Sequence, residues 1–143
     1  MVSQVRLCSI EDAKKIILDD EIYDRISDDI CPNKETLVFP ENLLYIGGYV
    51  GDQIVSAAVV HGSEYGDMAH FQVLKDYRLR YARELLEKTL KLCPRPLYAE
   101  FPSLYKPYMN FVKKLGFKEI EMKKNEFLKN GNVYDIHVLV LEN

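Results

Sequence analysis

Apolar residues recur along the chain with two spacings, and the change from one spacing to the other marks the expected elements. After the short apolar segment QVRLCSI, four residues have the spacing of one helical face, namely Ile10, Ala13, Ile16 and Ile17. Ser9 stands just before them and fits a helix N-cap, with Asp12 three residues further on. A second short helix is expected over DDEIYDRISDD. The first 30 residues therefore predict a strand followed by two helices.

Continuous apolar runs of strand length occupy the middle of the chain. Residues 30 to 41 contain two prolines and have no clear period, which predicts a loop. The runs NLLYIGGYV and IVSAAVVHG follow, separated by GDQ, and the turn segment SEYGD leads into MAHFQVL. Such runs joined by tight turns predict an antiparallel meander of three strands.

The last part of the chain alternates between the two spacings. A helical period begins after Tyr77 and ends at CPRP, and LYAEF then has the composition of a strand. Pro107 suits the first turn of another helix, and Gly116 suits its end. The runs FKEIEMKKNEFL and NVYDIHVLVLE, joined at KNGN, predict a closing hairpin.

The resulting order, βααβββαβαββ, predicts one mixed α/β (α+β) domain over residues 1 to 143. Its central sheet is expected to be mostly antiparallel, with about seven strands flanked by about four helices.

Composition and charge exclude several classes of protein. With 143 residues, 48% of them apolar and 29% charged, the chain can bury a core. Its net charge of −3 argues against nucleic-acid binding by the chain as a whole. The longest apolar runs are too short to cross a membrane, and the first ten residues lack the apolar core of a signal peptide. A membrane or nucleic-acid partner is therefore not expected.

Cysteine and histidine usage points to an intracellular protein without a metal. The cysteines, Cys8, Cys31 and Cys93, are odd in number and widely spaced, which predicts reduced thiols and a cytoplasmic setting. The histidines, His61, His70 and His137, do not have metal-ligand spacing, so no metal site is expected.

Charge is unevenly distributed along the chain. Residues 1 to 41 carry ten acidic and five basic side chains, whereas residues 75 to 91 carry six basic and three acidic ones. Two ligands, one cationic and one anionic, would explain this distribution, and so would two solvated faces. Asp28 and Asp29 are candidates to attract a cationic acceptor, and a turn role is the alternative.

The segment FQVLKDYRLRYARELLEKTL predicts a strand that runs directly into a basic helix. Arg78, Arg80 and Arg83 lie at the junction, and the segment contains no glycine. A helix start offers free backbone N–H groups and roughly half a positive charge, so it can bind an anion. Arginine side chains would then hold a phosphate that glycine backbone normally approaches. The alternative is a solvated helix start whose arginines pair with Asp76 and Glu84.

Several segments in the expected order resemble the GNAT acetyltransferase family. VLKDYR (residues 73 to 78) resembles the segment that leads into the family's acetyl-CoA pyrophosphate loop, and FVKKLGF (111 to 117) resembles its Y-E-K-L-G-F segment. VRLCSIEDAKKI resembles the opening strand and helix, and FLKNGNVYDIHVLVL resembles the closing hairpin of the ribosomal-protein branch. EIYDRISDD and HFQVLKDYR resemble a divergent subgroup encoded by tailed bacteriophages. The resemblance implies a GNAT fold, acetyl-CoA as cofactor, and an amine of a small molecule or protein as acceptor.

The chain departs from the family pattern at positions that matter for the cofactor. Tyr81 and Arg83 stand where the family's loop has glycines, and Tyr105 stands where it has a cofactor-side Asn. Val112 replaces a tyrosine that often acts as general acid, and Tyr108 falls where the ribosomal-protein branch has a Ser. The residues that the resemblance places at the cofactor are Gln72, Val73, Arg78, Leu79, Arg80, Tyr81, Ala82, Arg83 and Tyr105.

Three side chains are candidates for the chemistry of amine acetylation. His70 shares a strand face with Gln72 and has the pKa of a suitable base; the alternative is a histidine in the core or at the sheet edge. Glu100 on LYAEF is a candidate base or amine ligand, or else a salt-bridge residue. Tyr108 is a candidate acid for the leaving thiolate, or else a packing residue.

Two functional hypotheses follow. The first is an acetyl-CoA-dependent N-acetyltransferase. The second is a catalytically inactive GNAT-fold binding or assembly protein, a bacteriophage virion or accessory component with a phage or host protein partner, found in the virion or in the cytoplasm of a bacterial host. The missing glycines favour the second hypothesis, and the retained LGF segment and arginines permit the first. The oligomeric state is left open.

Overall fold

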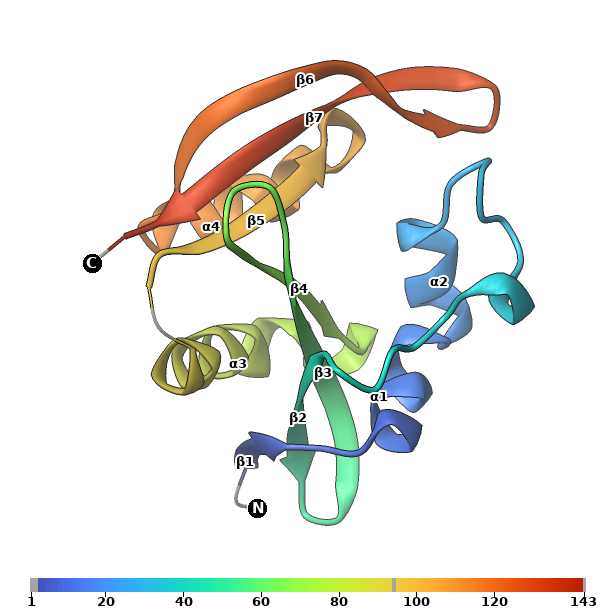
Figure 1. Cartoon of the computed structure of the whole chain (residues 1–143). Helices are drawn as coiled ribbons and strands as arrows, with labels where there is room; N and C mark the ends of the chain where they lie inside the picture. Colours follow the sequence, from blue (N-terminus) through green and yellow to red (C-terminus); the bar gives the residue numbers. More distant parts are fainter. Residues whose placement is uncertain (1–2, 94, 143) are drawn as a thin grey trace.

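The computed structural model describes residues 3–93 and 95–142, and within them the chain forms a seven-stranded sheet flanked by four α-helices (Figure 1). In chain order the elements are β1 (Ser3–Leu7), α1 (Ile10–Ile17), α2 (Asp20–Ile26), η1 (Lys34–Thr36), β2 (Leu44–Val50), β3 (Gln53–Gly62), β4 (Asp67–Val73), η2 (Lys75–Tyr77), α3 (Arg78–Leu92), β5 (Leu97–Pro102), η3 (Ser103–Tyr105), α4 (Lys106–Lys114), β6 (Lys118–Lys129) and β7 (Asn132–Leu141), where η marks a 3₁₀ turn. The predicted order of strands and α-helices is confirmed.

The sheet has the order β1-β2-β3-β4-β5-β7-β6 and is antiparallel except between β4 and β5. The predicted meander is β2-β3-β4, and the predicted closing hairpin is β6-β7. Strands β4 and β5 run parallel, and in the described part of the chain Met68 opposite Tyr98 is their single register pair. Beyond that pair the two strands diverge, and the sheet opens in its middle (Figure 1).

Helices cover both faces of the sheet. Helices α1 and α2 lie on one side of β2-β3-β4, and α3 lies on the other side (Figure 1). Helix α1 packs on β2 and β3, α3 packs on β3 and β4, and α4 packs on β5. Among the residues described, none of these helices is long and apolar enough to cross a membrane.

Local signals in the sequence account for the ends of several elements. The Ser9 Oγ accepts the Asp12 N–H at 3.1 Å, which makes Ser9 the N-cap of α1 as predicted. Gly116, with φ +111°, ends α4. Asn130 and Gly131 have φ of +53° and +77°, which is the backbone that a tight two-residue hairpin needs at both central positions. The KNGN signal therefore sets the β6-β7 turn.

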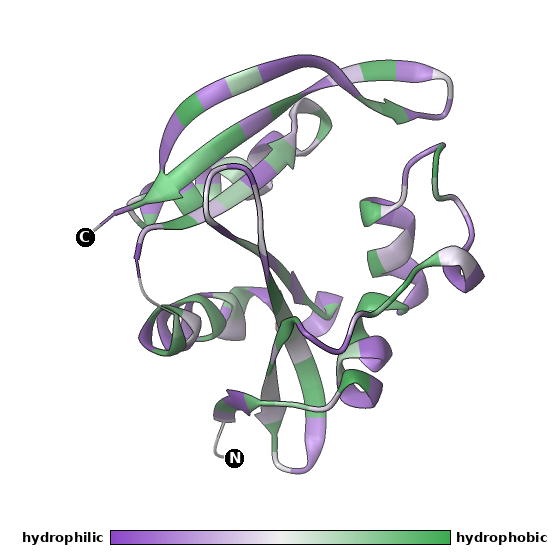
Figure 2. Cartoon of the chain, viewed as in Figure 1, coloured by the Kyte–Doolittle hydropathy of each residue, from purple (hydrophilic) through white to green (hydrophobic). Residues whose placement is uncertain are grey.

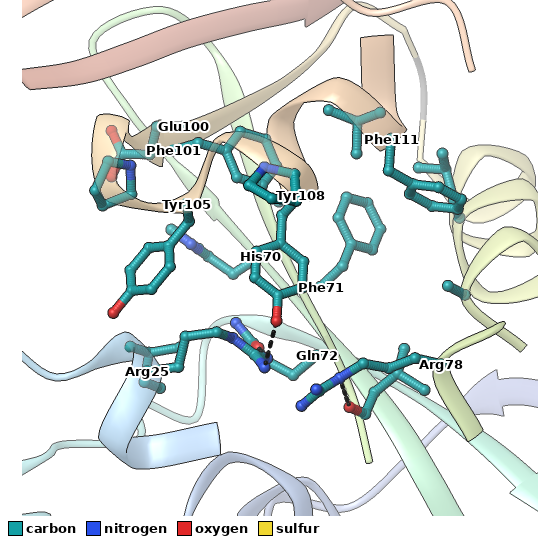
Figure 3. Close-up of a pocket in the computed structure, with 18 of the residues that line it drawn as sticks. Arg25, His70, Phe71, Gln72, Arg78, Glu100, Phe101, Tyr105, Tyr108 and Phe111 are labelled. Atoms are coloured by element: carbon teal, nitrogen blue, oxygen red, sulfur yellow. Dashed lines mark hydrogen bonds between the residues drawn. The ribbon is translucent and has the colours of Figure 1, made fainter. Parts of the chain in front are cut away.

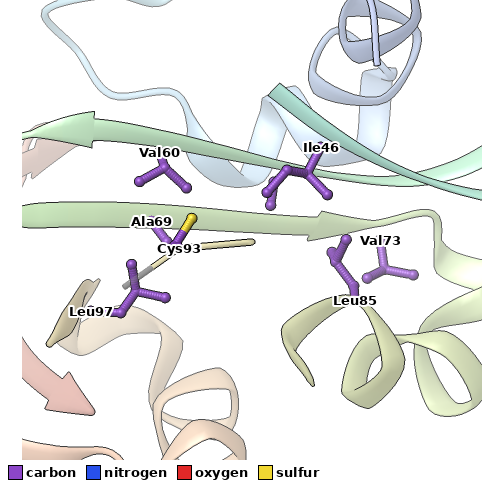
Figure 4. Packing of buried hydrophobic residues seen from close by; sticks show 8 residues of the cluster. Ile46, Val60, Ala69, Val73, Leu85, Cys93 and Leu97 are labelled. Atoms are coloured by element: carbon purple, nitrogen blue, oxygen red, sulfur yellow. The ribbon is translucent and has the colours of Figure 1, made fainter. Parts of the chain in front are cut away.

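The largest core cluster lies between α3 and the sheet (Figure 4). Leu85 of α3 is fully buried, and the cluster around it consists of Ile46, Ala58, Val60, Ala69, Val73, Cys93 and Leu97. Because these residues come from β2, β3, β4 and β5, the core joins both sides of the opening at its base. The C-terminal half of β7 is also buried, whereas β6 is an exposed edge strand in which hydrophobic and hydrophilic residues alternate (Figure 2).

Truncating Leu85 to alanine tests the contribution of this core. We expect Leu85→Ala to lower the free energy of unfolding by about 2–5 kcal/mol, because the change leaves a cavity among packed side chains. Leu92→Ala on the same helix is the matched control, since Leu92 is 47% exposed, and it should cost less than about 1 kcal/mol. Urea denaturation of both variants measures the difference, and equal losses would contradict this description of the core.

Candidate functional site

A cavity of about 490 Å³ lies where β4 and β5 diverge (Figure 3). Every residue of β4 from Ala69 to Val73 lines it. Because neighbouring residues of a strand point to opposite faces of the sheet, the cavity must pass beside β4 from one face to the other. One half therefore opens toward α2 and the other toward α3.

The half toward α2 collects the polar candidates. His70 and Gln72 point to this face, as the hydrogen bond between Gln72 and Arg25 of α2 shows. Glu100 also faces this side, because its neighbour Ala99 packs into the core against α3 and α4. Tyr105 and Tyr108 complete this half at η3 and the start of α4. The structure thus brings the three candidate catalytic residues, His70, Glu100 and Tyr108, to one cavity.

The half toward α3 contains the start of that helix. Arg78, Leu79 and Ala82 line the cavity, and the Leu79 side chain is fully exposed to it and to solvent. No side chain caps the N-terminus of α3, where Tyr77 is the N-cap residue. The first backbone N–H groups of this 15-residue helix therefore have no capping side chain, and the positive end of the helix dipole lies at this point.

Three predicted cofactor residues do not line the cavity. The Tyr81 ring is buried against Val50 and Val55, under the opposite side of α3. Arg80 is exposed, and its guanidinium lies 5.5 Å from the centre of the Tyr81 ring. Arg83 is exposed and pairs with Glu87 at 3.9 Å. Successive helical residues turn by about 100°, so only Arg78, Leu79 and Ala82 of this segment can face the gap.

Glu21 of α2 links the two arginines of the cavity. Its carboxylate binds the Arg25 guanidinium at 3.1 Å and also the Arg78 guanidinium. The Nε of Arg78 donates to the Val73 carbonyl at 3.0 Å. Arg25 in turn donates to the Gln72 Oε1 at 2.7 Å and lies 3.3 Å from the Tyr108 hydroxyl. The expected pairing of the arginines with Asp76 and Glu84 is not found in the described residues, and Glu84 accepts the Ser3 hydroxyl instead.

His70 contacts a second histidine across the sheet. The His61 and His70 Nε2 atoms are 2.9 Å apart. Burial, and then the nearby His61, lower the pKa of His70 to about 4 from its ordinary value of 6.5. His70 is therefore neutral at pH 7.

The two tyrosines differ in their surroundings. The Tyr105 and Tyr108 rings meet edge to face with centres 6.2 Å apart, and Arg25 lies over the Tyr108 ring at 4.8 Å. Burial raises the pKa of Tyr105. Tyr108 is partly exposed and keeps its hydroxyl at the cavity, within reach of a bound ligand.

Asp28 and Asp29 have turn roles. Asp28 accepts the N–H groups of Ile30 and Cys31 at 3.0 and 2.8 Å. Asp29 accepts the N–H groups of Asn130 and Gly131, both at 2.9 Å, and so joins the loop after α2 to the tip of the β6-β7 hairpin. These contacts explain both carboxylates without a cationic ligand.

Sequence reasoning missed Glu21 and Arg25, which the structure brings to the gap. Both lie on α2, at positions 21 and 25, and the spacing of four residues is a visible pairing signal. Nothing in the sequence indicated that α2 would face the β4-β5 opening. The apolar walls Phe101 and Phe111 were missed for the same reason.

Metal and thiol chemistry receive no support from the geometry. Across residues 3–93 and 95–142, no group of three or more His, Cys, Asp or Glu side chains could hold a metal ion. All three cysteines are free thiols. Burial raises the pKa of Cys8 to about 11, and it raises the pKa of Cys93 as well, so neither thiol is activated as a nucleophile.

Comparisons with known proteins identify the fold. The sequence matches no family model and no curated protein. The structure is similar to the ribosomal-protein-S18-alanine N-acetyltransferase from Escherichia coli, with a TM-score of 0.75 at 16% identity over 99% of this chain and 94% of that one. It is also similar to an N-acetyltransferase from Staphylococcus aureus Mu50, with a TM-score of 0.77 at 15% identity over 99% of both chains. The structure of Arabidopsis thaliana NAA60 in complex with acetyl-CoA is similar as well, with a TM-score of 0.75 at 15% identity over 99% of this chain and 98% of that one.

These similarities show that the chain has the GNAT acetyltransferase fold, with a mostly antiparallel seven-stranded sheet and four helices in the part that the structure describes. The fold that the sequence motifs implied is confirmed.

The neutral state of His70 makes stability depend on pH. Because its pKa is about 4 in the folded chain and about 6.5 when unfolded, the unfolded chain binds the additional proton between these values. The contribution of His70 to stability is full above pH 6.5 and is lost as the pH falls toward 4. We therefore expect urea unfolding to give a lower free energy at pH 5 than at pH 7, with a smaller drop in His70→Gln. An unchanged pH dependence in that variant would contradict the buried neutral imidazole.

Proposed function

We propose that this protein is an acetyl-CoA-dependent N-acetyltransferase that acetylates an amine of a small molecule or protein. The observation that carries the proposal is the cavity beside β4, which connects an open helix N-terminus on one face of the sheet to His70, Glu100 and Tyr108 on the other. Such a passage lets two reactants enter from opposite faces and meet beside one strand.

The half toward α3 fits a phosphorylated, elongated cofactor. The uncapped N-terminus of α3 offers backbone donors, and Arg78 adds a guanidinium that can donate two parallel hydrogen bonds to one phosphate. Phe71, Leu86 and Val112 form apolar walls that suit the cofactor's long arm. Acetyl-CoA would supply the acetyl thioester. Leu79 and Tyr81 do not plug this half, since Leu79 extends into solvent and Tyr81 packs into the core.

The half toward α2 fits an amine. Glu100 is the one acidic side chain that lines the cavity in the described residues, and no hydrogen bond or ion pair to its carboxylate is found there. It would attract the ammonium group of the acceptor, while neutral His70 would take a proton from the reacting amine. Tyr108 would donate a proton to the leaving thiolate. Ile26, Phe127 and Ile136 leave the remaining wall apolar.

The second hypothesis, a GNAT-fold protein without catalysis that serves in binding or assembly, keeps one supporting observation. Glu21 already neutralises Arg78, the arginine on which phosphate binding would depend. A phage or host protein partner would then replace the cofactor as ligand. Binding of acetyl-CoA separates the two hypotheses.

A thermal shift with acetyl-CoA is the direct test. Acetyl-CoA at about a hundred times its dissociation constant should stabilise the folded chain by about 2.7 kcal/mol. Arg78→Ala should reduce the shift, because its guanidinium lies in the gap. Arg83→Ala is the matched control and should leave the shift intact, since Arg83 pairs with Glu87 away from the cavity. The absence of a shift for the wild type at millimolar acetyl-CoA would refute the enzyme hypothesis and favour the assembly role.

Removing the negative charge of Glu21 should tighten cofactor binding. We expect Glu21→Gln to lower the dissociation constant of acetyl-CoA by roughly two- to fivefold, the range of a partly exposed ion pair, because Arg78 no longer has a competing carboxylate. Glu87→Gln, which frees Arg83 instead, should have no effect. Isothermal titration calorimetry measures all three dissociation constants, and weaker binding in Glu21→Gln would show that the Glu21 bridge supports the site instead of competing with it.

A further inference from the structure

Two imidazole rings meet on the face of the sheet that turns toward α2. His70 of β4 lies opposite Val59 of β3 in the register, and His61 is two residues further along β3, so the histidines are diagonal neighbours on one face. Their Nε2 atoms are 2.9 Å apart, their planes differ by 9°, and their ring centres are 5.0 Å apart. Because the nitrogens are far closer than the centres, the rings meet through their Nε2 edges and not face to face. This is the geometry of an N–H···N hydrogen bond.

The surroundings of His61 decide which nitrogen carries the proton. The His61 Nδ1 lies 2.8 Å from the Gly62 carbonyl, which can only accept, so Nδ1 is the donor. In neutral His61 the Nε2 is then the acceptor. The His70 Nε2 must donate to it, and the His70 Nδ1 is left with a free lone pair. The Gly62 carbonyl thus fixes the tautomer of His61, and the His61 ring fixes the tautomer of His70.

The pair runs from the cavity toward solvent. Both histidines are partly exposed, but His70 lines the cavity, whereas His61 does not line it and makes a surface hydrogen bond to Gly62 through its Nδ1. The other charged or titratable side chains around the cavity are Arg25, Arg78, Glu100, Tyr105 and Tyr108. Arg25 and Arg78 are guanidinium cations paired with Glu21, and a guanidinium has no acceptor, so neither can take a proton from His70.

We propose that His61 is a positioning residue, which holds His70 in the Nε2–H tautomer with a free Nδ1 and receives the proton that His70 gives up from Nε2 during acetyl transfer. This inference rests on the proposed function, because it assigns the acetyl acceptor's proton to His70. As the amine nitrogen bonds to the acetyl carbon and the carbon–sulfur bond breaks, the amine proton passes to the His70 Nδ1. The His70 Nε2 proton passes to the His61 Nε2. The pair then carries one extra proton. It returns through the same hydrogen bond, and the His70 Nδ1 releases a proton to the departing thiolate or to water in the cavity, so that both starting tautomers are restored.

Transfer of the proton to His61 compensates for the low pKa of His70. A histidine whose pKa is about 4 binds a proton weakly, so His70 alone would hold the amine's proton at a high free energy. Passing the charge to a ring that reaches solvent removes the desolvation that lowers the pKa of His70. A second imidazole in line therefore makes a buried histidine a usable base.

Nitrogen-15 NMR of the histidine rings in the free protein tests the tautomers and the shared proton. We expect a protonated Nδ1 in His61, a protonated Nε2 in His70, and both Nε2 signals moving together at a single midpoint as the first proton binds. His61→Phe removes the acceptor, so His70 should lose its fixed tautomer. His61→Gln keeps an acceptor oxygen at a similar reach and should preserve it, and His137→Gln should leave both signals unchanged. Independent titration of the two rings, or a protonated His70 Nδ1, would overturn the proposal.

Turnover separates the relay from simple positioning. With acetyl-CoA and benzylamine, His61→Gln should lower kcat by about tenfold or more without raising the KM for acetyl-CoA, because an amide cannot take up the proton. Added imidazole should restore part of kcat in His61→Ala. Wild-type kcat in His61→Gln would exclude the relay. If the wild type binds acetyl-CoA but does not acetylate benzylamine, benzylamine is not an acceptor, and the NMR result alone decides whether His61 fixes the tautomer of His70. If the wild type does not bind acetyl-CoA, the proposed function itself fails.

Discussion

The site depends on the short pairing of β4 with β5. In the described residues these neighbouring parallel strands share one register pair, Met68 with Tyr98, and then separate. Buried side chains such as Leu97 and Leu85 hold the base of the opening together, so the strands diverge from a fixed point. Backbone groups of β4 beyond Met68 on that side have no partner strand, and five consecutive residues line the cavity instead. The opening is thus a consequence of the sheet topology and not of a flexible loop.

Charges around the opening are arranged so that little net charge remains inside it. Glu21 neutralises part of the charge of Arg25 and Arg78, and the Nε2 atoms of His61 and His70 lie at hydrogen-bond distance from each other. Among the described residues Glu100 has no partner for its carboxylate on one face, and the start of α3 supplies positive potential on the other. This distribution of charge would favour a cation at one face of the cavity and an anion at the other, as the proposed function requires. The missing loop glycines do not remove this arrangement, because Tyr81 packs into the core and Leu79, at the rim of the cavity, extends into solvent.

The sequence predicted the fold better than the site, and the reason is physical. Strand and helix periods, the Ser9 cap and the Asn-Gly turn are local signals, and each is confirmed. His70, Glu100 and Tyr108 were proposed because the resemblance placed their strands and helix beside the opening, and all three line the cavity. The inclusion of Tyr81 followed the loop motif, whereas in the structure Tyr81 lies four residues before Leu85 and is buried with it. Glu21 and Arg25 contact residues of distant segments, which a single sequence does not reveal, and the contact between His61 and His70 depends on the exact register of β3 with β4.

The proposed function requires that the passage between β4 and β5 receives acetyl-CoA. Amide ¹H–¹⁵N NMR spectra recorded during titration with acetyl-CoA test it most directly. The account predicts that the largest shifts fall on residues 69 to 73, on residues 99 to 102 and on the first turn of α3, while β1 and the β6-β7 tip stay unchanged. Two results would contradict it: shifts confined to the exposed face of α3 around Arg80 and Arg83, or no shifts at all on β4 and β5.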